Sequence, residues 1–193
     1  MAASARDLLT RAAEGFGRRV HAVPDTAWDD DTPDEDWTVR DLLGHLVSEH
    51  LWAVPLLDGA TVEDVDGRFD GDVLGDDPVT AWDDAIAASL ARWADTEDDA
   101  VVHLSSGPTP AGEYAEQMLL DLVVHAWDLA RGAGLDERLD PQCVEHVLGY
   151  VRPRADQWRR GGIFGDRVDT GSRDPQDQLL GLVGRDPRHT DAE

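Results

Sequence analysis

Apolar residues recur every three or four positions along five long stretches of the chain, which is the periodicity of helices that bury one face. The first stretch follows Ser4, a residue type that caps helices, and continues to Val20. The second follows Thr38, a similar cap residue, and ends before Gly59. The pattern predicts an amphipathic helix in each of these two stretches.

Two further helices are predicted between residues 80 and 130. Thr80 marks the start of the third helix. Thr109 can cap the fourth, because Pro110 has no N–H and none is needed at the first helical position. The apolar pattern of this helix continues to about Ala130. The stretch Val101–Leu104, between the two helices, is a short run of β type.

A fifth helix is predicted from Asp140 through Trp158, because Asp140 precedes a proline in the same cap-then-proline order. The tail holds one more short helix, over residues 174–184. The stretches 24–37 and 61–78 are acidic and carry Pro or Gly, so they are predicted to be connections.

The sequence contains no internal repeat and no linker on the scale of a domain. A chain of 193 residues can bury a core of its own, and 41% of its residues are hydrophobic, as in ordinary globular proteins. We therefore expect an all-α fold in a single domain of residues 1–193. The helical bundle should span about residues 5–160, followed by the tail.

The charge of the chain is strongly negative. It has 41 acidic residues against 17 basic ones, all of them arginine, and a formal net charge of −24. Such a charge repels phosphate backbones and anionic lipid headgroups, so we expect neither nucleic acid nor a membrane surface as a partner. The composition is equally typical of a GC-rich or salt-adapted source, so it indicates no specific function.

Three features favour a cytoplasmic location. The sequence has a single cysteine, Cys143, which excludes an intramolecular disulfide. Residues 1–20 carry charges throughout and lack the apolar core of a signal peptide. Apolar runs fall well short of the ~18 residues that a membrane span needs.

The strongest candidate for chemistry lies in the fourth predicted helix. Asp121 and His125 are four residues apart and project from one helix face, and Asp128 continues that stripe. No arginine occurs between Met118 and Ala130, so a carboxylate buried there must be protonated, hydrated or neutralised by a cation. A divalent metal ion would do this. The alternatives are an exposed Asp121 and a core histidine at position 125.

A third ligand is available in the second predicted helix. His45 lies at one edge of the apolar arc, on a stripe with Glu49, one turn further on. Glu49 is therefore a candidate for a further ligand or for a residue that accepts a hydrogen bond from one of the ligands. His50 lies on the opposite flank and is expected in the core or at its boundary. Trp52 and Trp127 are interpreted as core residues, with a substrate wall as the alternative, and His103 and Tyr114 are weaker candidates for the pocket.

Two segments carry a resemblance to a known family: Trp37-Thr-Val-Arg-Asp-Leu-Leu-Gly-His45 and Asp121-Leu-Val-Val-His-Ala-Trp-Asp-Leu-Ala130. They resemble actinobacterial proteins related to mycothiol-dependent maleylpyruvate isomerase, which belong to the wider group of DinB-like metal-binding bundles. The tail, residues 177–187, is similar to the ending of a subgroup of these proteins. The resemblance extends from Leu8 to Pro187.

The resemblance implies an up-down-down-up four-helix bundle with additional short helices. It also implies a zinc-type ion held by one histidine of the second helix and by an acid-x3-His pair of a later helix. These ligands correspond to His45, Asp121 and His125. The isomerase has Glu where Asp121 stands. It also has a smaller second domain, which we do not expect here, and we therefore do not expect maleylpyruvate isomerisation itself.

Three protein ligands would leave one coordination position open, as in catalytic zinc sites. Two histidines and a carboxylate suit Zn²⁺, with Fe²⁺, Mn²⁺ and Ni²⁺ as alternatives. The thiol-dependent relatives imply mycothiol or another low-molecular-weight thiol, whose pKa such an ion would lower. Asp128 could accept a hydrogen bond from a ligating imidazole and fix its tautomer, or be an ordinary polar residue near the helix end.

The sequence therefore predicts an enzyme, a metal- and thiol-dependent transferase or isomerase that acts on a small electrophile. One alternative is a non-catalytic metal- or ligand-binding module of the same fold. Another is a bundle without metal that works through protein contacts. The expected partners are a small-molecule substrate and the thiol, and an apolar outer patch would allow a homodimer.

Overall fold

The computed structural model describes residues 3–34 and 37–188. The chain divides into two compact units, unit 1 (residues 1–138) and unit 2 (residues 139–193). The single-domain organisation stays a prediction. Within the described ranges, no helix combines the length and apolar character needed to cross a membrane.

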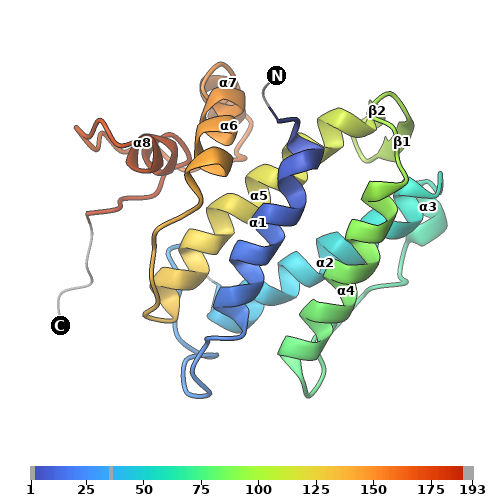
Figure 1. The fold of residues 1–193 in the computed structure, drawn as a ribbon, viewed down its shortest axis with the longest axis horizontal. Coiled ribbons are helices and arrows are strands. Elements are labelled where there is room, and N and C mark those ends of the chain that lie inside the picture. Colours follow the sequence, from blue (N-terminus) through green and yellow to red (C-terminus); the bar gives the residue numbers. More distant parts are fainter. Residues whose placement is uncertain (1–2, 35–36, 189–193) are drawn as a thin grey trace. The chain divides into compact units, whose positions relative to one another are not determined.

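Unit 1 is a four-helix bundle with a short hairpin. Its elements are α1 (Ala5–Val20), α2 (Val39–Leu57), α3 (Val62–Val65), α4 (Pro78–Ala94), β1 (Val101–Leu104), β2 (Gly107–Pro110) and α5 (Ala111–Gly132). The helix α1 packs mainly against α5, and α2 packs against both α4 and α5. Figure 1 shows α1 and α5 running in one direction and α2 and α4 in the other. The expected up-down-down-up bundle is confirmed.

In unit 1, two predicted helix starts match the structure and two do not. Ser4 and Thr38 cap α1 and α2 in capping boxes, as predicted. The helix α4 begins earlier than predicted, because Asp77 is its cap and accepts a hydrogen bond from the backbone N–H of Thr80. Thr109 does not cap α5: it lies in β2, and its hydroxyl donates to the Gly107 carbonyl. The β-type run at Val101–Leu104 is confirmed as β1.

Unit 2 contains α6 (Pro141–Val151), α7 (Ala155–Arg160) and α8 (Pro175–Leu182). The prediction of one fifth helix through Trp158 was wrong, because the chain breaks into α6 and α7 around Pro153, which has no N–H to continue the helix. The predicted tail helix is confirmed as α8, which packs against α6.

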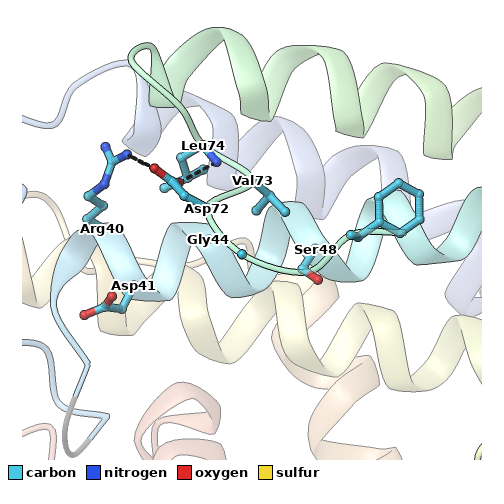
Figure 2. Close-up of a pocket in the computed structure, with 9 residues that line it drawn as sticks. Arg40, Asp41, Gly44, Ser48, Asp72, Val73 and Leu74 are labelled. Carbon is cyan, nitrogen blue, oxygen red and sulfur yellow. Dashed lines mark hydrogen bonds and ion pairs between the residues drawn. The ribbon is translucent and has the colours of Figure 1, made fainter. Parts of the chain in front are cut away.

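The segment after α3 crosses the outer face of α2 (Figure 2). Arg40 of α2 donates to the Asp72 carboxylate at 3.2 Å and to the Gly75 carbonyl at 2.7 Å, which fastens the segment to the helix. Beneath it lies a hollow of about 330 Å³, lined by Arg40, Asp41, Gly44, Ser48, Phe69, Gly71, Asp72, Val73 and Leu74. The predicted metal ligands are not among the residues that line this hollow.

Candidate metal centre

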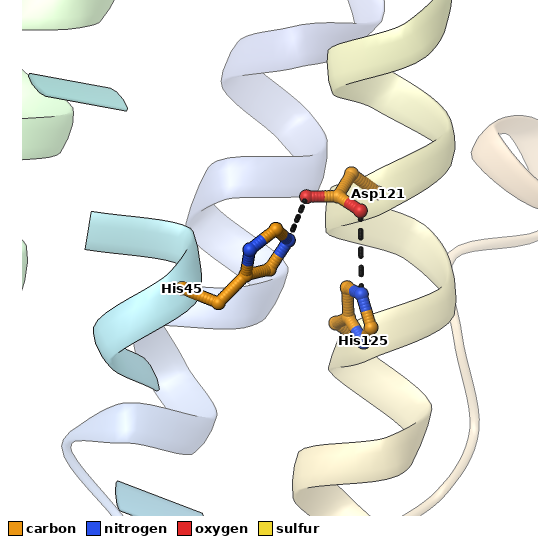
Figure 3. Close-up of side chains that lie close together, drawn as sticks. All are labelled: His45, Asp121 and His125. Carbon is orange, nitrogen blue, oxygen red and sulfur yellow. Dashed lines mark hydrogen bonds and ion pairs between the residues drawn. The ribbon is translucent and has the colours of Figure 1, made fainter. Parts of the chain in front are cut away.

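Three side chains from two helices converge inside unit 1 (Figure 3). His45 projects from α2, and Asp121 and His125 project from α5. Nε2 of His45 lies 2.9 Å from Oδ2 of Asp121, and Nε2 of His125 lies 3.2 Å from Oδ1 of the same carboxylate. One potential ligand atom from each residue lies within 4.8 Å of the other two. The structure thus brings together the three residues predicted to be ligands.

Helix geometry explains the convergence. Asp121 and His125 are one turn apart on α5, and α2 packs against that face with His45 at the contact. The side chains of His45 and Asp121 are each 28% exposed, whereas that of His125 is 10% exposed. Asp121 is therefore half-buried rather than exposed, and two imidazoles pair with its carboxylate, which the sequence predicted to need protonation, hydration or a neutralising cation.

In the metal-free cluster, the carboxylate of Asp121 and the imidazole of His125 each favour the charged form of the other. Burial disfavours the ionised form of Asp121, but the imidazoles of His125 and His45 outweigh it and hold its pKa below the ordinary value. Burial also opposes a charge on His125, yet the carboxylates of Asp121 and Asp128 raise the pKa of His125 to about 10. In the metal-free protein His125 is therefore an imidazolium whose two N–H groups donate to carboxylates.

The far side of the His125 ring faces two more carboxylates. Nδ1 lies 3.0 Å from Oδ2 of Asp128, which is fully buried, and 3.8 Å from Oδ2 of Asp34. Asp34, His125 and Asp128 also have the spacing of a metal cluster. Because the Nδ1 hydrogen is donated to Asp128, we interpret these acids as groups that orient the ring and leave Nε2 free for an ion. Asp128 had this role in the sequence prediction, whereas Asp34 was missed.

Glu49 and Tyr114 approach the cluster from α2 and α5. Glu49 is half-buried, and its carboxylate is not among the close ligand atoms, so the structure does not group it with the ligands. Burial and the neighbouring charge of Asp121 raise the pKa of Glu49 above its ordinary value. Tyr114 is buried, and burial together with the charges of Glu49 and Asp121 raises the pKa of its hydroxyl. Both groups are therefore biased to keep their protons.

The remaining candidates lie elsewhere. His50 is fully buried, as expected, with Nδ1 2.9 Å from the Ser89 hydroxyl, and burial lowers its pKa to about 4. Trp127 is buried, and Trp52 packs its ring against that of Phe69. His103 lies in β1, outside the cluster of ligand atoms.

Sequence reasoning assigned no role to the ring of Trp37. The centroid of this ring lies 4.9 Å from that of His45 and 5.8 Å from that of His125. The residue lies just before the Thr38 cap of α2, and no helical period marks its position. Only its place in a family motif could have drawn attention to it.

The residues fit a divalent ion of the zinc type. Two imidazole nitrogens and a carboxylate form a mixed donor set, and each oxygen of the Asp121 carboxylate already faces one of the two nitrogens. An ion at this point would take the place of the imidazole protons. Three protein ligands would leave a position for an exogenous ligand.

The comparisons with known proteins identify the family and the fold. The model of the "Mycothiol maleylpyruvate isomerase N-terminal domain" family matches residues 9–130. The chain belongs to this family. The matched region begins in α1 and ends in α5, so it includes all three candidate ligands.

The similarity to individual proteins extends beyond the region that the family model matches. Two uncharacterized proteins of Mycobacterium tuberculosis are 26% identical to this chain over 185 residues, which cover 92% of this chain and 96% of each relative. They are MT0763 of strain CDC 1551 / Oshkosh and Rv0738 of strain ATCC 25618 / H37Rv. A crystal structure of a mutant mycothiol-dependent maleylpyruvate isomerase has the same fold, with a TM-score of 0.65 and 16% identity. The match covers 84% of this chain and 72% of the isomerase.

Proposed function

We propose that this family member binds a divalent metal ion, Zn²⁺ by preference, through His45, Asp121 and His125. We further propose that it uses this ion with a low-molecular-weight thiol such as mycothiol, as a transferase or isomerase of a small electrophile. The observation that carries the proposal is the convergence of both Nε2 atoms on the Asp121 carboxylate.

Each residue of the centre has a distinct task in this proposal. His45, Asp121 and His125 hold the ion, and Asp128 fixes the His125 tautomer from behind. The ion supplies an open position at which a thiol would lose its proton at neutral pH. Tyr114, whose hydroxyl pKa is raised, can donate a hydrogen bond to a developing negative charge on the electrophile.

The thiol assignment is supported by the family and by the fold neighbour. The family description names mycothiol, and the neighbour is a mycothiol-dependent enzyme. The isomerase acts on maleylpyruvate. For this chain we propose a small electrophile without naming the compound. The protein would act without nucleic acid or membrane partners.

Turnover with a thiol tests this function. Zinc-loaded protein would be incubated with mycothiol and a panel of small electrophiles, and conjugated or isomerised products would be measured by mass spectrometry. We expect metal-dependent turnover that Asp121→Asn abolishes. His21→Ala, which alters an exposed histidine paired with Asp83, should leave turnover unchanged. Metal binding without turnover across the panel would contradict the enzyme and favour a metal- or ligand-binding module.

A further inference from the structure

The indole ring of Trp37 touches both candidate histidine ligands. It is tilted by 42° against the ring of His45 and by 34° against that of His125. The two imidazoles meet edge to face, with centroids 5.3 Å apart and planes at 74°. The three rings therefore pack as one group, to which α2, α5 and the loop before α2 each contribute one member.

The loop holds Trp37 in place without help from a metal. The backbone N–H of Trp37 donates to the Asp34 carbonyl at 3.1 Å. The Trp37 carbonyl accepts from the backbone N–H of Thr32 at 3.0 Å and from the Thr32 hydroxyl at 2.9 Å. The same loop pairs Asp31 with Thr38 in an antiparallel bridge. These bonds fix the backbone from which the indole reaches the imidazoles.

A free imidazole rotates about two side-chain bonds, and a metal ion must stop this rotation when it binds. Rings already held in the ligating orientation lose less conformational entropy, so the ion binds more tightly. Packing that locks the rotamers of ligands is the general requirement for a preorganised site. An aromatic ring in contact with both imidazoles meets this requirement for two ligands at once.

We propose that Trp37 is a positioning residue of the metal centre, whose indole holds His45 and His125 in the orientation that aims both Nε2 atoms at Asp121. The inference rests on the proposed metal site and adds a determinant of its affinity. Trp37 acts through the two histidines, and its effect is on metal binding rather than on the folding of the bundle.

Trp28 provides a matched control. It lies in the same loop, where its carbonyl accepts from the backbone N–H of Arg40 at 2.9 Å. Within residues 3–34 and 37–188, the aromatic contacts of His45 and His125 include Trp37 but not Trp28. Replacing Trp28 therefore removes the same kind of side chain from the same loop without touching the imidazoles.

The experiment compares Co²⁺ and Zn²⁺ binding by the wild type, Trp37→Leu, Trp37→Phe and Trp28→Leu. Affinities come from chelator competition, and the visible Co²⁺ spectrum reports ligand geometry. We expect Trp37→Leu to bind roughly 10–100-fold more weakly, the range seen when groups supporting the ligands are removed. Its Co²⁺ spectrum should change, and Trp37→Phe should recover part of both. Trp28→Leu should match the wild type.

Two outcomes overturn the inference in different ways. If the wild type binds Co²⁺ tightly and Trp37→Leu has the same affinity and spectrum, Trp37 does not position the ligands and the metal site stands. If the wild type binds neither ion, the proposed metal function fails and the role of Trp37 fails with it. Melting of the metal-free variants separates positioning from folding, since Trp37→Leu and Trp28→Leu should unfold at similar temperatures.

Discussion

His125 and Asp128 form a buried pair on α5, with Nδ1 of the imidazole 3.0 Å from Oδ2 of the carboxylate. They are three residues apart, so one helical turn aligns the acceptor with the ring. The pair decides which nitrogen of His125 faces Asp121. Because Nδ1 is hydrogen-bonded to Asp128, Nε2, which faces Asp121, is the nitrogen that can coordinate an ion.

Asp128→Asn tests this pairing. The amide keeps the shape of the carboxylate but loses its charge, so His125 should become a weaker ligand, and we expect metal affinity to fall roughly 10–100-fold. Competition with a chromophoric chelator would measure the change. Asp83→Asn, at an exposed acid of the same unit, is the control. Equal affinities in both variants would show that Asp128 plays no part in metal binding.

Metal affinity should depend steeply on pH. The carboxylates of Asp121 and Asp128 raise the pKa of His125 to about 10, against burial, so the metal must displace a proton from this imidazole throughout the neutral range. Apparent affinity should therefore rise with pH up to that value, by roughly tenfold per pH unit for each proton displaced. Calorimetry in two buffers of different ionisation enthalpy counts the protons. A pH-independent affinity between pH 6.5 and 8.5 would contradict a charged His125.

His50 predicts a separate effect of acid on stability. Its pKa is lowered by burial to about 4, below its ordinary value of 6.5. Between these values the unfolded chain binds a proton that the folded chain does not, so stability falls as the pH falls from 6.5 to 4. The loss should be about 3 kcal/mol, the shift converted at 1.36 kcal/mol per unit. Urea unfolding of the wild type and His50→Gln would show it, because the variant lacks this titration. Parallel pH profiles would contradict it.

The loop that carries Trp37 depends on a close approach at the end of α5. A Cβ at Gly132 would lie 2.9 Å from the Asp31 carbonyl and 3.1 Å from Thr32. Gly132→Ala should therefore push the loop outward, destabilise the protein by about 1–3 kcal/mol and weaken metal binding. Gly149→Ala, a helical glycine with nothing within 4 Å, is the matched control and should stabilise by a few tenths to about 1 kcal/mol. Equal melting temperatures for the two variants would contradict the close approach.

Local signals in the sequence predicted much of the bundle. The capping boxes at Ser4 and Thr38 locate the starts of α1 and α2 because cap and helix are neighbours in sequence. The same logic failed at Thr109, where pairing of β2 with β1 outweighed its capping tendency. It also missed the start of α4, although Asp77 precedes Pro78 in the same cap-then-proline order that marks Asp140.

The part of the candidate site that lies on one helix was predictable from helical spacing. Asp121, His125 and Asp128 share one stripe, so their grouping follows from the period of α5. His45 required the packing of α2 against α5, which the family resemblance supplied. Asp34 and Trp37 lie in a loop whose path is set by hydrogen bonds and by the space above Gly132. No periodic pattern encodes such a path, and their contacts with His125 emerge only from the structure.

The most direct test of the metal centre is metal stoichiometry. Protein would be purified without chelator and dialysed against Zn²⁺. The number of zinc ions per chain would then be measured by elemental mass spectrometry. We expect about one ion per wild-type chain, and strongly reduced content in His45→Ala, Asp121→Ala and His125→Ala, with His21→Ala unchanged. Equal metal content in the wild type and the three ligand variants, whether high or low, would contradict a site built from His45, Asp121 and His125.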